Sequence, residues 1–214
     1  MRPLEILSTL IAWTPFLLTG FGWNILIAFT AMLLGTGVGA GLAFMRLSRQ
    51  RWAVRTSTAV TEISRNVPTL VFQFYLAVML PNQWLVPGTP LTLDIPSWVR
   101  ASLALAVAVV GFTSDNLQIA IAEWRQGRHA TALLFLPSWT SYLLIIVIAS
   151  STASIIGVSE LVSRCNSVVN AMADTRLLIP LYLYASIIFL LVCYPLTLIM
   201  RAVKQRMAAN VSRS

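Results

Sequence analysis

The chain has 214 residues, of which 57% are hydrophobic and only 10% are charged, and its mean hydropathy is +0.79. Soluble domains carry about 25% charged residues, so this chain cannot cover a soluble surface and lipid must be its main solvent. The net charge of +8 does not indicate nucleic-acid binding, because the basic residues lie in short loops beside apolar runs, with no basic patch among exposed aromatics.

The N-terminal residues 1–19 are expected to form an external or interfacial segment ahead of the first membrane span. Their apolar stretch, 6–18, is broken by Pro15, which removes a helical hydrogen bond. The segment is not a convincing cleaved secretion signal, since no site of small residues ends a short apolar core.

Five longer apolar stretches follow, and each is long enough for a helix that crosses a bilayer core about 30 Å thick. In chain order they cover 23–45, 60–80, 99–122, 132–158 and 177–200. The connection 81–98 contains four prolines and Asp94 as its only charge, which is typical of an external loop with room for a short amphipathic piece. The sequence therefore predicts an all-α integral membrane protein with five transmembrane helices and one domain.

The distribution of basic residues predicts the orientation of these helices. Eleven of the fifteen Lys and Arg residues lie in or beside the first and third connections and the C-terminal tail. Cytoplasmic loops carry the excess of Lys and Arg. We therefore expect the N-terminus outside and the C-terminus in the cytoplasm.

The second predicted span carries polar residues that need an explanation, because a charge in a membrane costs about 2.5–3.5 kcal/mol on insertion scales. Glu62 and Arg65 are three residues apart and share a helix face, so they form either an interfacial ion pair or part of a pathway lining. Pro68 is expected to kink the helix. The amide of Gln73 lies deeper and is expected either to bond across helices or to line a pathway.

The fourth predicted span ends in a polar cluster. Ser150, Ser151 and their neighbours either bond back to helical carbonyls and pack closely, or form the polar wall of a substrate path. Beyond the span, Glu160 is expected to pair with Arg164 four residues later.

No catalytic or metal-binding arrangement appears in the sequence. His129 is the only histidine and has no other ligand type near it. Cys165 and Cys193 form neither a disulfide framework nor a zinc-type spacing. No phosphate-binding loop is present, so no catalytic residue, metal or cofactor is predicted, and the chain is not expected to be an enzyme.

Three stretches resemble the membrane subunits of bacterial ABC importers for polar amino acids, the histidine, arginine, glutamine and opine permease group. They are GFGWNILIAFTAMLLGTGVGAGLAFMRLSR (20–49), EISRNVPTLVFQFYLAVMLP (62–81) and LPSWTSYLLIIVIASSTASIIGVSEL (136–161). In the second stretch Glu62, Arg65 and Pro68 match the E–x–x–R–G–T–P pattern of the family, and Gln73 comes one residue later than the family's Gln.

The resemblance implies a type I ABC importer permease fold over residues 20–206, followed by a cytoplasmic tail, 207–214. It implies a multi-pass protein of the bacterial inner membrane that works with ABC ATPase subunits, a second permease subunit and a periplasmic solute-binding protein. ATP would be bound by the ATPase subunits and the substrate would be an amino acid. The residues expected to line or brace the translocation pathway are Glu62, Arg65, Gln73, Ser150, Ser151 and Glu160.

The connection between the third and fourth spans departs from the family. Its coupling signature, E–A–A followed by Gly, is degenerate here, and the connection is well over ten residues shorter. By position, the ATPase contact would fall on Gly127, Arg128, His129 and Ala130. Two hypotheses therefore stay open: a transporting permease subunit, and a structural or regulatory subunit that keeps the fold without ATPase coupling.

Overall fold

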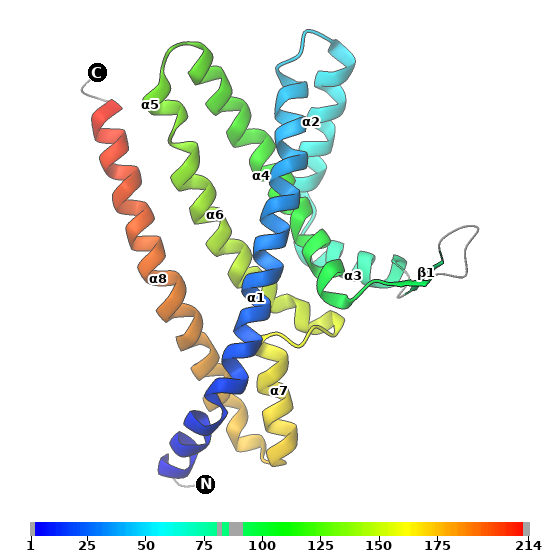
Figure 1. Cartoon of the computed structure of the whole chain (residues 1–214), viewed down its shortest axis with the longest axis vertical. Coiled ribbons are helices and arrows are strands. Elements are labelled where there is room, and N and C mark those ends of the chain that lie inside the picture. Colours follow the sequence, from blue (N-terminus) through cyan, green and yellow to red (C-terminus); the bar gives the residue numbers. More distant parts are fainter. Residues whose placement is uncertain (1–2, 81–82, 86–91, 212–214) are drawn as a thin grey trace.

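The computed structural model describes residues 3–80, 83–85 and 92–211. The long elements are helices, which Figure 1 shows as an elongated bundle. The helices are α1 (Pro3–Arg46), α2 (Arg51–Asn66), α3 (Thr69–Met79), α4 (Ser97–Arg125), α5 (His129–Ala132), α6 (Phe135–Ala149), η1 (Ser150–Ile156), α7 (Leu161–Met172), η2 (Thr175–Leu177) and α8 (Leu178–Val211).

Helix α1 is continuous through the expected boundary between the N-terminal segment and the first span. Its 44 residues extend about 66 Å at 1.5 Å per residue, roughly twice the thickness of a bilayer core. Pro15 lies inside the helix. The helix is held there by contacts with other parts of the chain: the hydroxyls of Thr14 and Tyr184 of α8 are 2.8 Å apart, and Leu17 is buried. The placement of 1–19 in the interface stays a prediction.

The second predicted span is not one helix. Val67 has an extended backbone (φ −84°, ψ 126°) and ends α2, and Pro68 precedes α3. The proline ring disfavours the helical conformation of the residue before it, so Pro68 breaks the helix at the place where a kink was expected. In Figure 1, α3 turns aside from α2.

Four of the described helical segments are long and apolar enough to cross a membrane: Leu4–Arg46, Ser97–Arg125, His129–Ile156 and Thr175–Ala209. They contain most of the expected first, third, fourth and fifth spans. The expected connection 81–98 holds two short antiparallel strands, β1 (Gln83–Leu85) and β2 (Thr92–Asp94), with Gln83 opposite Asp94. The all-α prediction is thus corrected by one small hairpin, and the rest of that loop lies outside the described residues.

The two ends of the described chain lie at opposite ends of the molecule (Figure 1). The α1–α2 connection, α5 and the end of α8 gather at the C-terminal end, whereas α7 lies near the N-terminus, and most of the arginines lie in or beside the first three. This arrangement is the one expected from the charge distribution.

Helices α1 and α4 are in close contact because two glycines face α4. A Cβ on Gly35 would lie 2.6 Å from the carbonyl oxygen of Ala106, and one on Gly39 would lie 2.8 Å from that of Val110. Small residues four apart let two helix backbones approach closely in lipid. This contact brings the ends of α1 and α2 against the polar part of α4.

Candidate functional site

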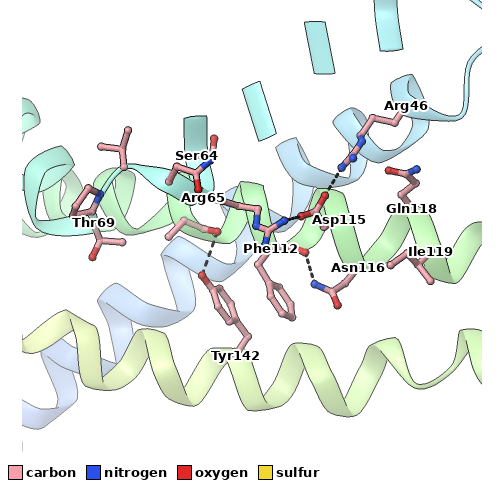
Figure 2. Close-up of a pocket in the computed structure, with 14 residues that line it drawn as sticks. Arg46, Ser64, Arg65, Thr69, Phe112, Asp115, Asn116, Gln118, Ile119 and Tyr142 are labelled. Atoms are coloured by element: carbon pink, nitrogen blue, oxygen red, sulfur yellow. Dashed lines mark hydrogen bonds and ion pairs between the residues drawn. The ribbon is translucent and has the colours of Figure 1, made fainter. Parts of the chain in front are cut away.

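A cavity of about 880 Å³ lies between the α2–α3 break, α4 and α6, with Arg46 of α1 at its rim (Figure 2). Its lining is largely polar, although it is built on apolar helices. The polar side chains are Arg46, Ser64, Arg65, Asn66, Thr69, Asp115, Asn116, Gln118 and Tyr142. An open cavity of this size, lined by charged and polar side chains and set among long apolar helices, is the strongest candidate site in the described part of the chain.

The charges of this cavity centre on Asp115. Its two carboxylate oxygens accept hydrogen bonds from two guanidinium groups, one from Arg46 and one from Arg65. The side chains of Arg46 and Asp115 are 18% and 21% exposed, whereas that of Arg65 is 60% exposed. Three helices, α1, α2 and α4, therefore meet in one charge cluster that carries an excess positive charge.

Of the two alternatives for Glu62 and Arg65, an ion pair or a pathway lining, the ion pair does not form. Arg65 turns toward Asp115 on α4, and Glu62 is exposed, with no hydrogen bond or ion pair to any described residue. Glu62 and Arg65 are only three residues apart on α2. The Arg65 guanidinium nevertheless pairs with the Asp115 carboxylate on α4, which also pairs with Arg46. Glu62 does not line this cavity, so its role in a pathway stays a prediction.

An aromatic pair forms another part of the cavity lining. Phe112 and Tyr142 stack with their ring centroids 3.9 Å apart, and the Tyr142 hydroxyl donates to the Ala108 carbonyl at 3.3 Å. The Asn116 side-chain amide donates to the Phe112 carbonyl at 2.8 Å. The two contacts of Tyr142 join α6 to α4 below the charge cluster, and the Asn116 bond lies within α4 (Figure 2).

Gln73 bonds across helices, as one of the two hypotheses expected. It is fully buried, and its Oε1 accepts from the Thr152 hydroxyl at 2.7 Å, which links α3 to η1. Its Nε2 has no partner among the described residues. A buried amide with one unsatisfied end is costly, so the position is suited to a further polar partner.

A second polar cluster joins α1 to the start of α7. The Asn24 amide donates to Ser150 Oγ and to Glu160 Oε2, both at 3.0 Å, and its oxygen accepts the Leu161 N–H at 3.1 Å. Glu160 also accepts the backbone N–H groups of Val162 and Ser163. Ser150 and Glu160 are therefore brought together as a buried brace at the N-terminus of α7.

The expected pair of Glu160 with Arg164 does not form. Arg164 bonds to the Ser159 carbonyl and to the Phe16 carbonyl and Thr19 hydroxyl of α1, because Glu160 turns back to cap its own helix. Burial raises the pKa of the Glu160 carboxyl, and hydrogen bonds from Val162, Ser163 and Asn24 partly offset this rise.

Ser151 lies apart from the brace. It bonds back to the Ile148 carbonyl at 2.8 Å and lines a separate, mostly apolar cavity of about 500 Å³ between the end of α6, α7 and α8. Ser150 and Ser151 thus have different surroundings although they are adjacent in the chain. That the six expected residues line or brace a pathway stays a prediction.

The connection between α4 and α6 is short and internally bonded. Gly127 has a left-handed backbone (φ +80°), which lets α4 end and the chain turn. Arg128 then forms two hydrogen bonds to the Glu123 carboxylate, and His129 packs edge-on against Trp124 at 4.3 Å between ring centroids. His129 and Ala130 begin α5, a single turn.

Sequence reasoning did not select Asp115, Arg46, Tyr142 or Asn24 as site residues. Asp115 could have been found, because a carboxylate within an apolar run is a functional-site hypothesis by default. Arg46 could not be singled out, because in the sequence it is one of several basic residues near a helix end. Among the described residues, no group of three His, Cys, Asp or Glu side chains could hold a metal ion.

Long apolar helices with an open polar cavity between them are the features of a multi-pass helical membrane protein. No family model matches the chain. Its sequence is 28% identical over 148 residues to the general L-amino acid transport system permease protein AapQ of Rhizobium johnstonii. The match covers 61% of this chain and 36% of that relative, so the chain spans little more than a third of the protein it resembles.

A solved structure supports the same assignment. A chain from the crystal structure of an amino acid ABC transporter with histidines superposes with a TM-score of 0.76 at 17% sequence identity. The superposition covers 93% of this chain and 97% of that one. The protein therefore has the permease fold of an amino acid ABC transporter, and the resemblance identified in the sequence is confirmed.

Proposed function

We propose that the chain is a transmembrane permease subunit of an ATP-driven ABC importer of amino acids in the bacterial inner membrane. It forms the translocation pathway with a second permease subunit, of the same or a different sequence. Two ATPase subunits act on the cytoplasmic side, and a periplasmic solute-binding protein delivers the amino acid. ATP binding rocks the two permease halves between inward-open and outward-open states, which is alternating access by rigid-body motion.

One observation carries this proposal: a polar cavity of about 880 Å³ lies inside a bundle that has an amino acid transporter fold. The cavity lies at the break between α2 and α3, and interrupted helices are typical of transporter binding sites. Arg65 lies in this part of the pathway. Gln73, Ser150 and Glu160 brace the helices around it, and Ser151 faces a second space.

Uptake measurements test the proposal directly. We expect a strain without this chain to lose ATP-dependent uptake of a subset of radiolabelled amino acids, and the wild-type chain to restore it. Uptake of a sugar through an unrelated importer is the control. Unchanged uptake of every amino acid in the deletion strain would exclude the transport function.

A second candidate function is a structural or regulatory subunit that does not couple to an ATPase. The observation that favours it is the size of α5, which has only the four residues His129–Ala132. Affinity purification of the tagged chain in mild detergent separates the two functions. Recovery of an ATPase together with a second permease supports the importer, whereas recovery of the chain without an ATPase supports the uncoupled subunit.

The charge-reversal variant Arg128→Glu tests the coupling contact on Gly127, Arg128, His129 and Ala130. It removes the bidentate pair with Glu123 and places two carboxylates side by side. We expect it to reduce co-purification of the ATPase. Arg176→Glu, in η2 at the opposite end of the molecule, is the matched control and should retain the ATPase.

A further inference from the structure

We propose that the cavity between α2, α3, α4 and α6 binds the carboxylate group of a small solute through the Arg65 guanidinium. This inference rests on the proposed function in one respect: the solute is the transported amino acid. The site then favours amino acids with acidic or neutral side chains over basic ones.

The charge balance of the cavity leaves one guanidinium available. Its lining contains two arginines and one carboxylate, that of Asp115. Arg46, with the less exposed side chain, is the permanent partner of Asp115, whereas Arg65 is 60% exposed toward the open space. If Arg65 moves to a solute, Asp115 keeps its bond to Arg46 and no carboxylate is left without a cation.

The chemistry of Arg65 suits a carboxylate. A guanidinium has five N–H donors arranged as a planar fork that can hold both oxygens of a carboxylate. Arg65 uses one nitrogen, NH1, for Asp115, and its other donors have no hydrogen-bond partner among the described residues. Asp115 is thus a built-in competitor that occupies the arginine until a solute carboxylate replaces it.

The position of Arg65 places further donors beside it. The hydroxyl of Thr69 and the amide of Gln118 line the same cavity and have no partner among the described residues. Thr69 also begins α3, so the positive end of that helix faces the space. A carboxylate is stabilised by each of these groups, whereas a basic side chain brings a second positive charge toward Arg46 and Arg65.

Binding measurements on the complex that copurifies with the chain, placed in nanodiscs, test the proposal. The probes are L-glutamate, L-glutamine and L-arginine, measured by isothermal titration calorimetry. For the wild type we expect L-arginine to bind at least ten-fold more weakly than L-glutamate. Arg65→Gln should weaken binding of L-glutamate and L-glutamine by ten-fold or more. The control Arg55→Gln, an exposed arginine on the same helix outside the cavity, should bind like the wild type.

Asp115→Asn provides a signature that a purely structural Arg65 would not produce. Because it removes the competitor and leaves both arginines unpaired, we expect L-glutamate to bind several-fold more tightly. Weaker binding in Asp115→Asn with an unchanged melting temperature, or wild-type binding in Arg65→Gln, would overturn the proposal. If uptake depends on the chain but Arg65→Gln binds and transports normally, the carboxylate site is wrong and the permease function stands. If uptake does not depend on the chain, the permease function itself fails.

Discussion

At the scale of single residues, Asn24 connects three distant parts of the described chain. One amide contacts Ser150, Glu160 and the backbone of Leu161, and so joins α1, η1 and α7. All of its hydrogen-bonding atoms are buried. Buried polar networks of this kind stabilise a specific packing only when every member is satisfied.

We predict that Asn24→Ala destabilises the protein by about 1–3 kcal/mol, because it leaves the buried Leu161 N–H without its partner and removes a donor from Ser150 and from Glu160. Thermal unfolding in detergent measures the effect. Ser159→Ala, at an exposed position beside Glu160, is the control and should unfold like the wild type. Equal melting temperatures for both variants would show that the network does not contribute to stability.

The Glu160 carboxyl is predicted to make stability depend on pH. Burial raises its pKa above the ordinary value of 4.5, so the folded state binds its proton more tightly than the unfolded state. The associated stability is fully present below about pH 4.5 and is lost as the pH rises through the raised pKa. Glu160→Gln should remove this decline.

Melting temperatures of the wild type and Glu160→Gln between about pH 4.5 and pH 8 check this prediction. As the pH rises, the melting temperature of the wild type should fall relative to that of Glu160→Gln. Glu62→Gln, at an exposed carboxyl, should follow the wild type at every pH. A pH-independent difference between wild type and Glu160→Gln would contradict the assignment.

At the scale of elements, the α1–α4 contact depends on which glycines face α4. Gly35 and Gly39 are buried against it, whereas a Cβ added to Gly37 would have no neighbouring atom within 4 Å. The spacing of four residues places the first two on one helix face, and the spacing of two places Gly37 on another. The run of glycines therefore has two different structural roles.

We predict opposite effects for two alanine variants of this run. Gly35→Ala should destabilise the protein by about 1–3 kcal/mol, because the added methyl group collides with Val109 and the Ala106 carbonyl. Gly37→Ala should be neutral or stabilising by up to about 1 kcal/mol, because alanine favours the helix. Thermal unfolding of the pair measures both, and similar losses in the two variants would rule out the specific contact.

The break at Val67 and Pro68 is the element that creates the candidate site. A continuous helix over 60–80 would have satisfied its backbone groups internally, and it would have left no helix end inside the bundle. The extended Val67 ends α2 next to Arg65, and Pro68 then starts α3 beside the cavity. Local proline stereochemistry thus produces an opening whose polar lining comes from the two helix ends at the break and from α1, α4 and α6.

At the scale of the whole molecule, the described chain has its basic connections at one end and α7 at the other (Figure 1). We predict that this polarity corresponds to an external N-terminus and a cytoplasmic C-terminus. Single cysteines at Ser8 and Ala208, both exposed positions, test it in a variant in which Cys165 and Cys193 are replaced by alanine.

A membrane-impermeant maleimide should label the Ser8→Cys protein in intact spheroplasts. It should label the Ala208→Cys protein only after the membrane is permeabilised. The variant that lacks all cysteines is the control for background labelling. Labelling of the Ala208→Cys protein in intact spheroplasts would show that the orientation is the opposite of the predicted one.

The sequence by itself determined the protein class, the approximate position of four spans and the place where the second one is interrupted. These are local properties: hydropathy over about 20 residues predicts a membrane helix, and Pro68 acts on its immediate neighbour. The resemblance in residues 62–81 and 136–161 also predicted the permease fold that the structural comparison confirms.

Only the tertiary structure decided which polar groups meet. Arg65 bonds to a residue 50 positions away rather than to Glu62, and Asn24 bonds to Leu161 across 137 positions. Sequence spacing predicted Glu62 with Arg65 and Glu160 with Arg164, yet Arg65 bonds to α4 and Arg164 bonds to α1, while Glu160 caps its own helix and binds Asn24. In an apolar bundle, a charged side chain takes the partner that packing brings closest, and packing is set by contacts such as the Gly35 and Gly39 approach, which no local pattern specifies.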